Sequence, residues 1–362
     1  MTAKIVEIWG IFHIFVNSKI KKMLTRVIND KCANEFFQLL EKSENIVLTC
    51  HVRPDGDALG STLGFYHLLL RWGKNPKVVI PDKAPRSLSF MPGYKELVAY
   101  SQYKEFAESL IEKAELIICC DFNKLSRLDQ LSETIEKSSA KKVLVDHHLD
   151  PDNFTDLIFS FHDMSSASEL TFRLIAALGL MDMMDKNSAT CICTGIITDT
   201  RNLSVNCEYP DLYIIMYELL KKGVDKRRIV KEALETKSYN SVKLSAYAIS
   251  QKLNIYEQHR AAVIVLNKDE LIQHNYEKGD TEGLVNEPLE IKGVTYSFFL
   301  REDPDCIKVS ARSVNNFPVN QICEECFNGG GHVQAAGGEF YGTLKECEEI
   351  LLNVMPKYDK FL

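Results

Sequence analysis

Four groups of acidic and histidine side chains are spaced along the first part of the chain. In chain order they are His51 with Asp55 and Asp57, then Asp121, then Asp146 with His147 and His148, and last Asp199. Carboxylates and imidazoles without thiolates suit Mn²⁺ or Mg²⁺ better than Zn²⁺ or Co²⁺. These side chains are too many to bind one ion that also keeps coordination positions open for water or substrate. We therefore expect two Mn²⁺ ions bridged by a shared carboxylate, with Mg²⁺ or Co²⁺ as substitutes.

Two ions about 3.5–4 Å apart can bind both the attacking and the leaving oxygen of a phosphoryl displacement. Such a centre predicts hydrolysis of a phosphoester by an activated water. Each piece alone has a plainer explanation, since Pro54 and Gly56 favour a turn around Asp55, and a lone buried histidine is usually a core residue. The conjunction of all four groups favours the metal site.

Three of these groups follow apolar runs that we expect to be buried strands. The predicted strands are Asn45–Cys50, Lys77–Ile80, Leu116–Asp121 and Lys141–His148, and the predicted helices around them are Ala33–Glu44, a helix ending near Trp72, Ser166–Leu178 and Asn187–Thr198. The last run is apolar enough to be a strand instead. Alternating strands and helices predict an α/β domain with a parallel sheet and helices on both faces. Ligands bind at the carboxyl ends of such strands.

The pattern changes after two more charged helical stretches, Asp211–Gly223 and Lys226–Leu253. Strands are expected at Ala261–Leu266, Thr295–Leu300 and Ile307–Ala311, which predicts a smaller α+β domain. The expected organisation is an amino-terminal extension at 1–30, with Met23 as a candidate natural start, a catalytic domain at 31–235, a connector helix at 236–255 and a substrate-binding domain at 256–362.

A glycine run lies in the second domain. Gly329, Gly330 and Gly331 leave backbone N–H groups unobstructed, which predicts an anion-binding nest, and His332 follows directly. Arg312 follows a predicted strand and could bind phosphate with two hydrogen bonds. The plainer alternatives are a flexible turn for the glycines and a surface charge for the arginine.

Composition limits the partners. The chain has 362 residues and a formal net charge of −7, which favours a small anionic substrate over a long duplex, because duplex binding needs a basic face. Eleven cysteines show no disulfide framework, which suits a reducing compartment and predicts the cytoplasm. The apolar stretch Ile5–Val16 is too short to span a membrane and resembles neither a signal peptide nor an anchor. The sequence leaves a homodimer open.

Together these motifs resemble the DHH phosphoesterase superfamily. The similarity runs from about residue 30 to the carboxyl terminus and is carried by the following residues: His51-x-x-Pro-Asp-Gly-Asp-Ala-x-Gly60, Asp121, Asp146-His-His148, Thr198-Asp-Thr200 and Gly329-Gly-Gly-His-x-x-Ala-Ala-Gly337. The glycine motif marks the subgroup with the DHH-associated carboxyl-terminal domain. The spacing resembles its NrnA-type branch of nanoRNases and pAp phosphatases.

The resemblance implies an active site in the cleft between two domains, with two manganese ions. It implies that His51 and Asp55 bind one ion, that Asp57, His147 and Asp199 bind the other, and that Asp121 bridges them. His148 would lie close to the scissile phosphate, and Asp146 would orient a histidine. Arg312, His332 and the glycine run would hold a substrate phosphate.

One departure affects the substrate. The family usually has glycine after Thr200, whereas this chain has Arg201 and Asn202, which could add a cationic contact. Short RNAs and 3'-phosphoadenosine 5'-phosphate (pAp) are the first expectation, and cyclic or linear dinucleotides such as c-di-AMP and pApA are the alternative. A RecJ-like exonuclease and an inorganic pyrophosphatase are disfavoured. A nucleotide-binding sensor is the alternative that is not an enzyme.

Overall fold

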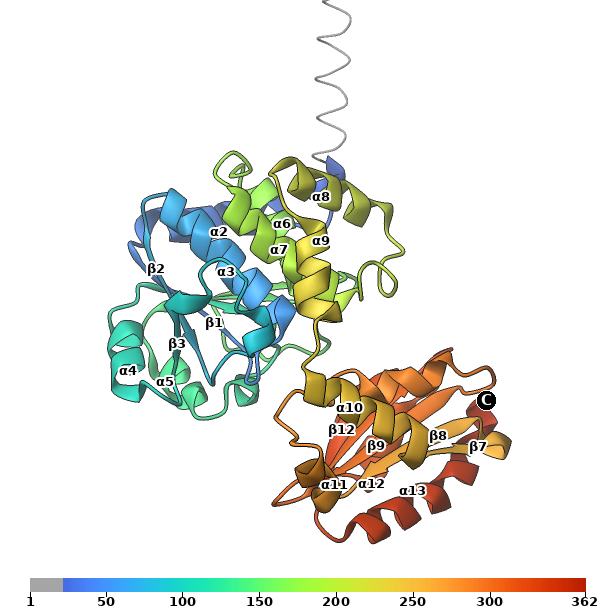
Figure 1. The fold of residues 1–362 in the computed structure, drawn as a ribbon. Coiled ribbons are helices and arrows are strands. Elements are labelled where there is room, and N and C mark those ends of the chain that lie inside the picture. The colour runs from blue at the N-terminus through green and yellow to red at the C-terminus, as the bar shows by residue number, and fades with distance from the viewer. Residues whose placement is uncertain (1–21) are drawn as a thin grey trace, which may run out of the picture. The chain divides into compact units, whose positions relative to one another are not determined.

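The computed structural model describes residues 22–362. The chain divides into two compact units, one ending at Thr236 and the other running from Lys237 to Leu362 (Figure 1). Each unit has its own six-stranded sheet and its own hydrophobic core. The prediction about the stretch Ile5–Val16 lies outside the described residues.

The sheet of the first unit is parallel throughout. Its strands lie in the order β3-β2-β1-β4-β5-β6, and their bounds are β1 Asn45–Cys50, β2 Asn75–Ile80, β3 Leu97–Ala99, β4 Leu116–Cys120, β5 Lys141–Asp146 and β6 Leu157–Ser160. The four strands expected in this unit are confirmed. The two short edge strands β3 and β6 were not expected.

Helices cover both faces of this sheet (Figure 1). Their bounds are α2 Asp30–Lys42, α3 Gly56–Arg71, α4 Lys104–Glu112, α5 Leu131–Lys137, α6 Ala167–Ala177, α7 Lys186–Asp199, α8 Pro210–Lys221 and α9 Lys226–Val230. Alternate residues of β1 pack to opposite sides: Leu48 joins the core under α2, α3, α6 and α7, whereas Val47 joins the core under α4 and α5. The predicted fold class, a parallel sheet between two helical layers, is confirmed.

The stretch Lys226–Leu253 is not one helix, although most of the connector expected at 236–255 is helical, from Tyr239 to Lys252. Helix α9 passes into a wider turn, η4 (Lys231–Glu235), and the chain then becomes extended at Thr236. A new helix, α10 (Tyr239–Tyr247), begins after Ser238, whose hydroxyl caps it by accepting a hydrogen bond from the N–H of Ser241. The last residues of the predicted helix form strand β7 (Leu253–Tyr256) instead.

The second unit has a mixed sheet in the order β11-β12-β10-β9-β8-β7. Its remaining elements are β8 Ala261–Leu266, α11 Lys268–Gln273, β9 Tyr296–Glu302, β10 Ile307–Ser313, α12 Val319–Cys326, β11 Gly330–His332, β12 Ala335–Phe340 and α13 Leu344–Tyr358. The pair β8–β9 is parallel and the other pairs are antiparallel. The smaller α+β domain is therefore confirmed.

Short helical turns complete the chain. They are η1 Arg86–Leu88, η2 Tyr94–Glu96, η3 Leu125–Leu128, η5 Ala248–Lys252, η6 Glu257–His259, η7 Leu284–Glu290 and η8 Asp359–Phe361. Residues Leu24 and Ile28, which precede α2, are buried in the core of the first unit. Among the described residues, no helix is both long enough and apolar enough to cross a membrane.

Candidate metal centre

The carboxyl ends of three neighbouring strands place the predicted ligands together. His51 follows β1, Asp121 follows β4, and Asp146 ends β5 with His147 directly after it. Asp55 is the residue that caps α3, where its Oδ1 accepts hydrogen bonds of 3.0 Å from the N–H groups of Asp57 and Ala58. Parallel strands β1, β4 and β5 are adjacent, so their ends meet at one edge of the sheet.

Asp199 reaches the same place from a helix. It is the last residue of α7, so its run is the helix that we expected and not the alternative strand. Helix α7 packs closely along α3, which carries Asp57 in its first turn. The packing of α7 against α3 thus places Asp199 beside the ligands at the strand ends.

Three sets of three side chains could each hold an ion, with ligand atoms that all lie within 4.8 Å of one another. Two of them, His51 with Asp55 and Asp121, and Asp57 with His147 and Asp199, match the expected ligands of two ions. The remaining set is Asp121, His147 and His148, which shares one residue with each of the other two. In the first set, Nε2 of His51 lies 3.3 Å from Asp121 Oδ2 and 3.9 Å from Asp55 Oδ2. In the second, Nε2 of His147 lies 3.4 Å from Asp199 Oδ2 and 3.9 Å from Asp57 Oδ2.

Asp121 lies between the two sets. Its Oδ2 faces His51, and its Oδ1 lies 3.6 Å from Nε2 of His147. This Oδ1 atom is buried and has no hydrogen-bond partner, an arrangement that costs free energy unless a cation binds it. Burial, and after it the carboxylates of Asp57 and Asp55, raises the pKa of Asp121 well above its usual range. A bridging cation would remove this penalty.

The histidine tautomers suit metal binding. Nδ1 of His51 donates to the carbonyl of Val52 at 2.8 Å, and Nδ1 of His147 donates to the carbonyl of Met164 at 3.2 Å. Each ring therefore presents an Nε2 lone pair to the carboxylates. Most of the separations between these nitrogens and oxygens exceed a normal hydrogen bond, but they suit two ligands of the same ion, which lie about 3 Å apart or more when each bond is about 2.1 Å.

Asp146 acts on His148 rather than on an ion. Its Oδ1 accepts a 2.7 Å hydrogen bond from Nδ1 of His148, and its Oδ2 accepts one of 3.1 Å from the His148 N–H. Burial lowers the pKa of His148, but the Asp146 hydrogen bond and the charge of Asp121 outweigh it and raise the pKa above its ordinary value. Nδ1 of His148 also lies 3.8 Å from Asp121 Oδ1.

Glycines let α3 and α7 approach closely enough to bring Asp57 and Asp199 together. A Cβ on Gly56 would lie 2.3 Å from Thr198 Oγ1. A Cβ on Gly195 would lie 1.9 Å from Ser168 Oγ and 2.7 Å from Asp57 Oδ1. Larger residues at these positions would push the helices apart.

Sequence reasoning missed the segment Met164–Ser168, which is the loop before α6 together with the first two residues of that helix. The N–H groups of Ala167 and Ser168 donate to the two carboxylate oxygens of Asp57 at 2.6 and 2.8 Å. Burial is the main cause that raises the pKa of Asp57, and the charge of His147 and then the hydrogen bonds from Ser168 oppose it. Since the contacts come from backbone atoms, only the helix start predicted at Ser166 pointed to them.

Arg201 and Asn202 lie just beyond Asp199. Arg201, Asn202 and Leu203 have φ angles of 44°, 59° and 65°, so three successive residues other than glycine adopt left-handed backbone. Both Arg201 and Asn202 are exposed, and the amide oxygen of Asn202 accepts a hydrogen bond from Nζ of Lys226. Such strain beside a functional site is typical of segments that serve the site.

In the second unit, Arg312 and His332 share one face of the sheet. Arg312 on β10 is paired with Ala335 on β12, which is paired with His332 on β11, and directly paired residues point to the same face. Nη1 of Arg312 donates to the carbonyls of Ala311 and Ala336 at 2.8 and 3.3 Å. The structure thus places these two residues on one face of the sheet, with β12 between their strands.

The glycine run is an edge strand rather than an open loop. Gly330 and Gly331 belong to β11, and the N–H of Gly329 donates to the carbonyl of Cys323. A Cβ on Gly329 would lie 2.0 Å from the carbonyl oxygen of Gly337. Close contact with β12 therefore requires glycine here, and the Gly329 N–H is already engaged.

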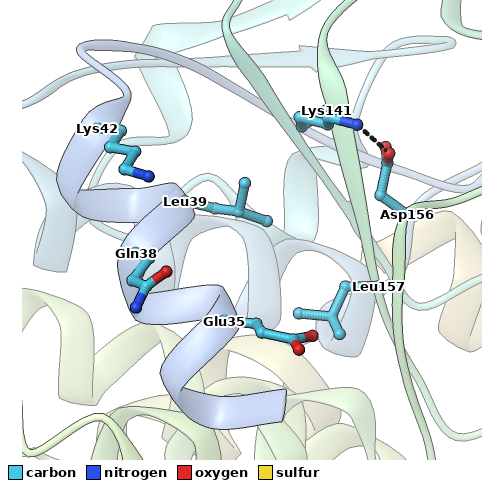
Figure 2. A pocket seen from close by; sticks show the side chains of 7 residues that line it. All are labelled: Glu35, Gln38, Leu39, Lys42, Lys141, Asp156 and Leu157. Carbon is cyan, nitrogen blue, oxygen red and sulfur yellow. Dashed lines mark hydrogen bonds and ion pairs between the residues drawn. The ribbon is translucent and has the colours of Figure 1, made fainter. Parts of the chain in front are cut away.

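A hollow of about 340 Å³ lies on the first unit, and Figure 2 shows the side chains that line it. It is lined by Glu35, Gln38, Leu39, Lys42, Lys141, Asp156 and Leu157. Lys141 begins β5, whereas Asp146 ends it, so the hollow is at the opposite end of that strand. Two of the lining residues, Lys141 and Asp156, form an ion pair with each other.

Comparison with known proteins identifies the family of each unit. Residues 45–196 match the DHH family, N-terminal domain, and residues 258–356 match the DHHA1 domain. The crystal structure of an exopolyphosphatase-related protein from Bacteroides fragilis superposes with a TM-score of 0.91 and 42% identity, over 93% of this chain and 98% of that one.

Two further relatives are more distant. The bifunctional oligoribonuclease and PAP phosphatase NrnA of Bacillus subtilis is 28% identical, over 88% of this chain and 96% of its own length. RecJ of Thermus thermophilus in complex with Mn²⁺ has a TM-score of 0.57 at 14% identity, over 94% of this chain and 57% of that one, and shares the fold. The resemblance seen in the motifs is confirmed, and the chain belongs to the DHH phosphoesterase family, with a DHHA1 domain after the DHH domain.

Proposed function

We propose that this protein is a phosphoester hydrolase that uses divalent metal ions to degrade very short RNAs and to remove a phosphate from pAp. The observation that carries the proposal is the position of Asp121, whose buried carboxylate lies between two sets of ligands. The B. subtilis relative, which matches this chain over nearly its whole length, is named for the same two activities.

His51 and Asp55 would hold one ion, Asp57, His147 and Asp199 the other, and Asp121 both. Manganese is the proposed ion, with magnesium or cobalt as substitutes, because the ligands are oxygens and imidazoles without thiolate. When bound, the ions supply Lewis acidity toward the scissile phosphate and lower the pKa of the attacking water.

His148 would act on the reacting phosphate itself. Its Nδ1–H is held by Asp146, so the ring keeps one tautomer and one orientation. Its raised pKa favours the protonated imidazole, which stabilises negative charge developing on phosphate oxygens. Asp146 would set both properties without touching the substrate.

Two regions would bind the rest of the substrate. Arg312, His332 and the backbone of Gly330 and Gly331 would contact a terminal phosphate from the second unit, consistent with Arg312 and His332 sharing a face of the sheet. The Gly329 N–H would not take part, because it already donates to Cys323. Arg201 would add a cationic contact beside Asp199. The cysteines are all free, which supports a reducing compartment, and we place the protein in the cytoplasm.

The test is a turnover assay with three substrates in parallel. Wild type and Asp121→Ala would each be incubated with Mn²⁺ and a short RNA, pAp or linear diadenylate. We expect mononucleotide from the RNA and phosphate from pAp with wild type alone. Faster cleavage of the diadenylate than of both others would favour the dinucleotide alternative. Ligand-induced thermal stabilisation without any product would indicate a sensor and overturn the proposal.

A further inference from the structure

The residues Met164–Ser166 and the first two residues of α6, together named the loop Met164–Ser168, contact two ligands of the same proposed ion. The carbonyl of Met164 accepts a hydrogen bond from Nδ1 of His147, and the N–H groups of Ala167 and Ser168 donate to Asp57. The loop therefore fixes the ring of one ligand and both carboxylate oxygens of another. A shift in this loop would move both ligands together.

The middle of the loop is fastened by Glu169. Its Oε2 accepts a 2.8 Å hydrogen bond from the N–H of Ser165, and its Oε1 accepts two hydrogen bonds from Arg173, at 2.8 Å from Nε and 2.6 Å from Nη2. The side chain of Glu169 is only 3% exposed. A carboxylate this deeply buried needs its cationic partner, since unpaired burial is costly.

Arg173 is fully buried and connects this carboxylate to distant parts of the first unit. Its Nη1 donates to the carbonyls of Met23 and Leu24, both at 3.1 Å, and its Nη2 also approaches Asp211 Oδ2 at 3.3 Å. Asp211 in turn pairs with Arg26. A planar guanidinium can satisfy this many partners at once, which a lysine cannot.

The other ligand set is held by different contacts. His51 donates to the carbonyl of Val52, Asp55 caps α3, and Asp121 follows β4. Neither Glu169 nor the loop Met164–Ser168 supplies these contacts. The two proposed ion subsites thus differ in what positions their ligands.

We propose that Glu169 and Arg173 are positioning residues for one of the two ion subsites, the one formed by Asp57, His147 and Asp199. The pair holds the loop Met164–Ser168 in the conformation that aligns Asp57 and His147, while the subsite of His51 and Asp55 does not depend on it. This inference rests on the proposed two-ion function and specifies how that site is assembled.

The experiment is calorimetric titration of Mn²⁺ into the full-length protein. Wild type should bind two ions. Glu169→Gln keeps the size of the side chain but weakens the clamp on Ser165 and Arg173. It should bind one ion as wild type does and the second at least about tenfold more weakly, the lower end of what loss of a ligand-orienting contact costs. Arg173→Lys keeps the charge, so its affinity for the second ion should lie between those of wild type and Glu169→Gln.

A double variant separates positioning from the burial of an unpaired charge. Arg173→Met with Glu169→Leu removes both charges, so neither is left alone in the core, and it should still lose affinity for one ion. The control is Arg301→Lys in the second unit, where Arg301 also donates two hydrogen bonds to one carboxylate, that of Asp303, in a less buried pair. It should bind both ions normally.

Enzyme assays give a second readout. In Glu169→Gln the Mn²⁺ concentration for half-maximal rate should rise about tenfold or more, while kcat at saturating Mn²⁺ stays near that of wild type. A purely structural role would lower kcat without rescue by metal. The proposal is overturned if folded Glu169→Gln binds both ions normally, or if both ions weaken equally. If wild type binds two ions but cleaves no substrate, the proposed function fails and the positioning role stands.

Discussion

The carboxylate of Asp146 holds His148 by two hydrogen bonds, 2.7 Å from the ring Nδ1 and 3.1 Å from the backbone N–H. Asp146 belongs to neither ligand set, although it ends the strand that leads into His147. The aspartate of the Asp-His-His motif therefore has a different role from a metal ligand: it orients one of the two histidines that follow it. One histidine faces the carboxylate cluster, and the other is oriented by Asp146.

Asp146→Asn should lower kcat about 10²–10⁴-fold, the range over which a well-placed proton donor contributes. Asparagine removes the charge that favours protonated His148 and permits the other tautomer. The number of bound Mn²⁺ ions should not change, because Asp146 is outside both ligand sets. Steady-state rates with metal analysis check this, and a near-normal kcat or a lost ion would contradict the role given to Asp146.

Gly195→Ala should destabilise the first unit by about 1–3 kcal/mol and also weaken Mn²⁺ binding. The new Cβ would collide with Ser168 and with Asp57 Oδ1, so both packing and a ligand must shift. Gly64→Ala is the matched control, because its Cβ would collide with Ile192 in the same helix pair, two turns of α3 farther from Asp57. Urea unfolding should show that Gly64→Ala destabilises the unit about as much as Gly195→Ala does. Metal titration should show that Gly64→Ala keeps the Mn²⁺ affinity of wild type.

Asp211→Asn should lower stability at neutral pH by about 1–3 kcal/mol, the usual contribution of hydrogen bonds to charged groups. Burial raises the pKa of Asp211, but the hydrogen bond with Arg26 and the charge of Arg173 lower it below its ordinary value of 3.8. The ionised carboxylate therefore contributes stability above pH 3.8, and this contribution is lost as pH falls through the lowered pKa. Urea unfolding should show the gap between variant and wild type closing in strong acid, and a gap that widens there would contradict the assignment.

Arg201→Gly should raise KM for pAp with little change in kcat, because the arginine would contribute equally to binding the substrate and the transition state. Stability should not fall, since glycine adopts the φ of 44° at this position more readily than arginine does. Arg201→Lys should retain most of the affinity. An unchanged KM for every phosphate-bearing substrate would show that Arg201 does not contact the substrate.

The strand-end ligands could be predicted because their signal is local. A short apolar run followed by an acid or histidine marks both the strand and its end, and parallel pairing then gathers His51, Asp121 and Asp146 at one edge. The position of Asp199 could not be predicted from such a local signal, because it depends on α7 packing against glycines of α3. The fold class was also predictable, since alternating strands and helices allow few arrangements.

The parts that could not be predicted depend on tertiary contacts. The stretch Lys226–Leu253 has continuous helical character, yet capping by Ser238 and pairing of β7 with β8 divide it. The loop Met164–Ser168 acts through backbone atoms, so its side chains gave little sign of a role. Glu169 and Arg173, four residues apart in an apolar run, form a buried ion pair there that the helix predicted at Ser166–Leu178 did not reveal.

The most direct test of the two-ion centre is anomalous diffraction at the manganese edge from crystals of this protein grown with Mn²⁺. The account predicts two peaks, one bonded to His51, Asp55 and Asp121, the other to Asp57, His147 and Asp199, with Asp121 reaching both. A single peak, or peaks whose ligands do not include Asp121, would contradict it.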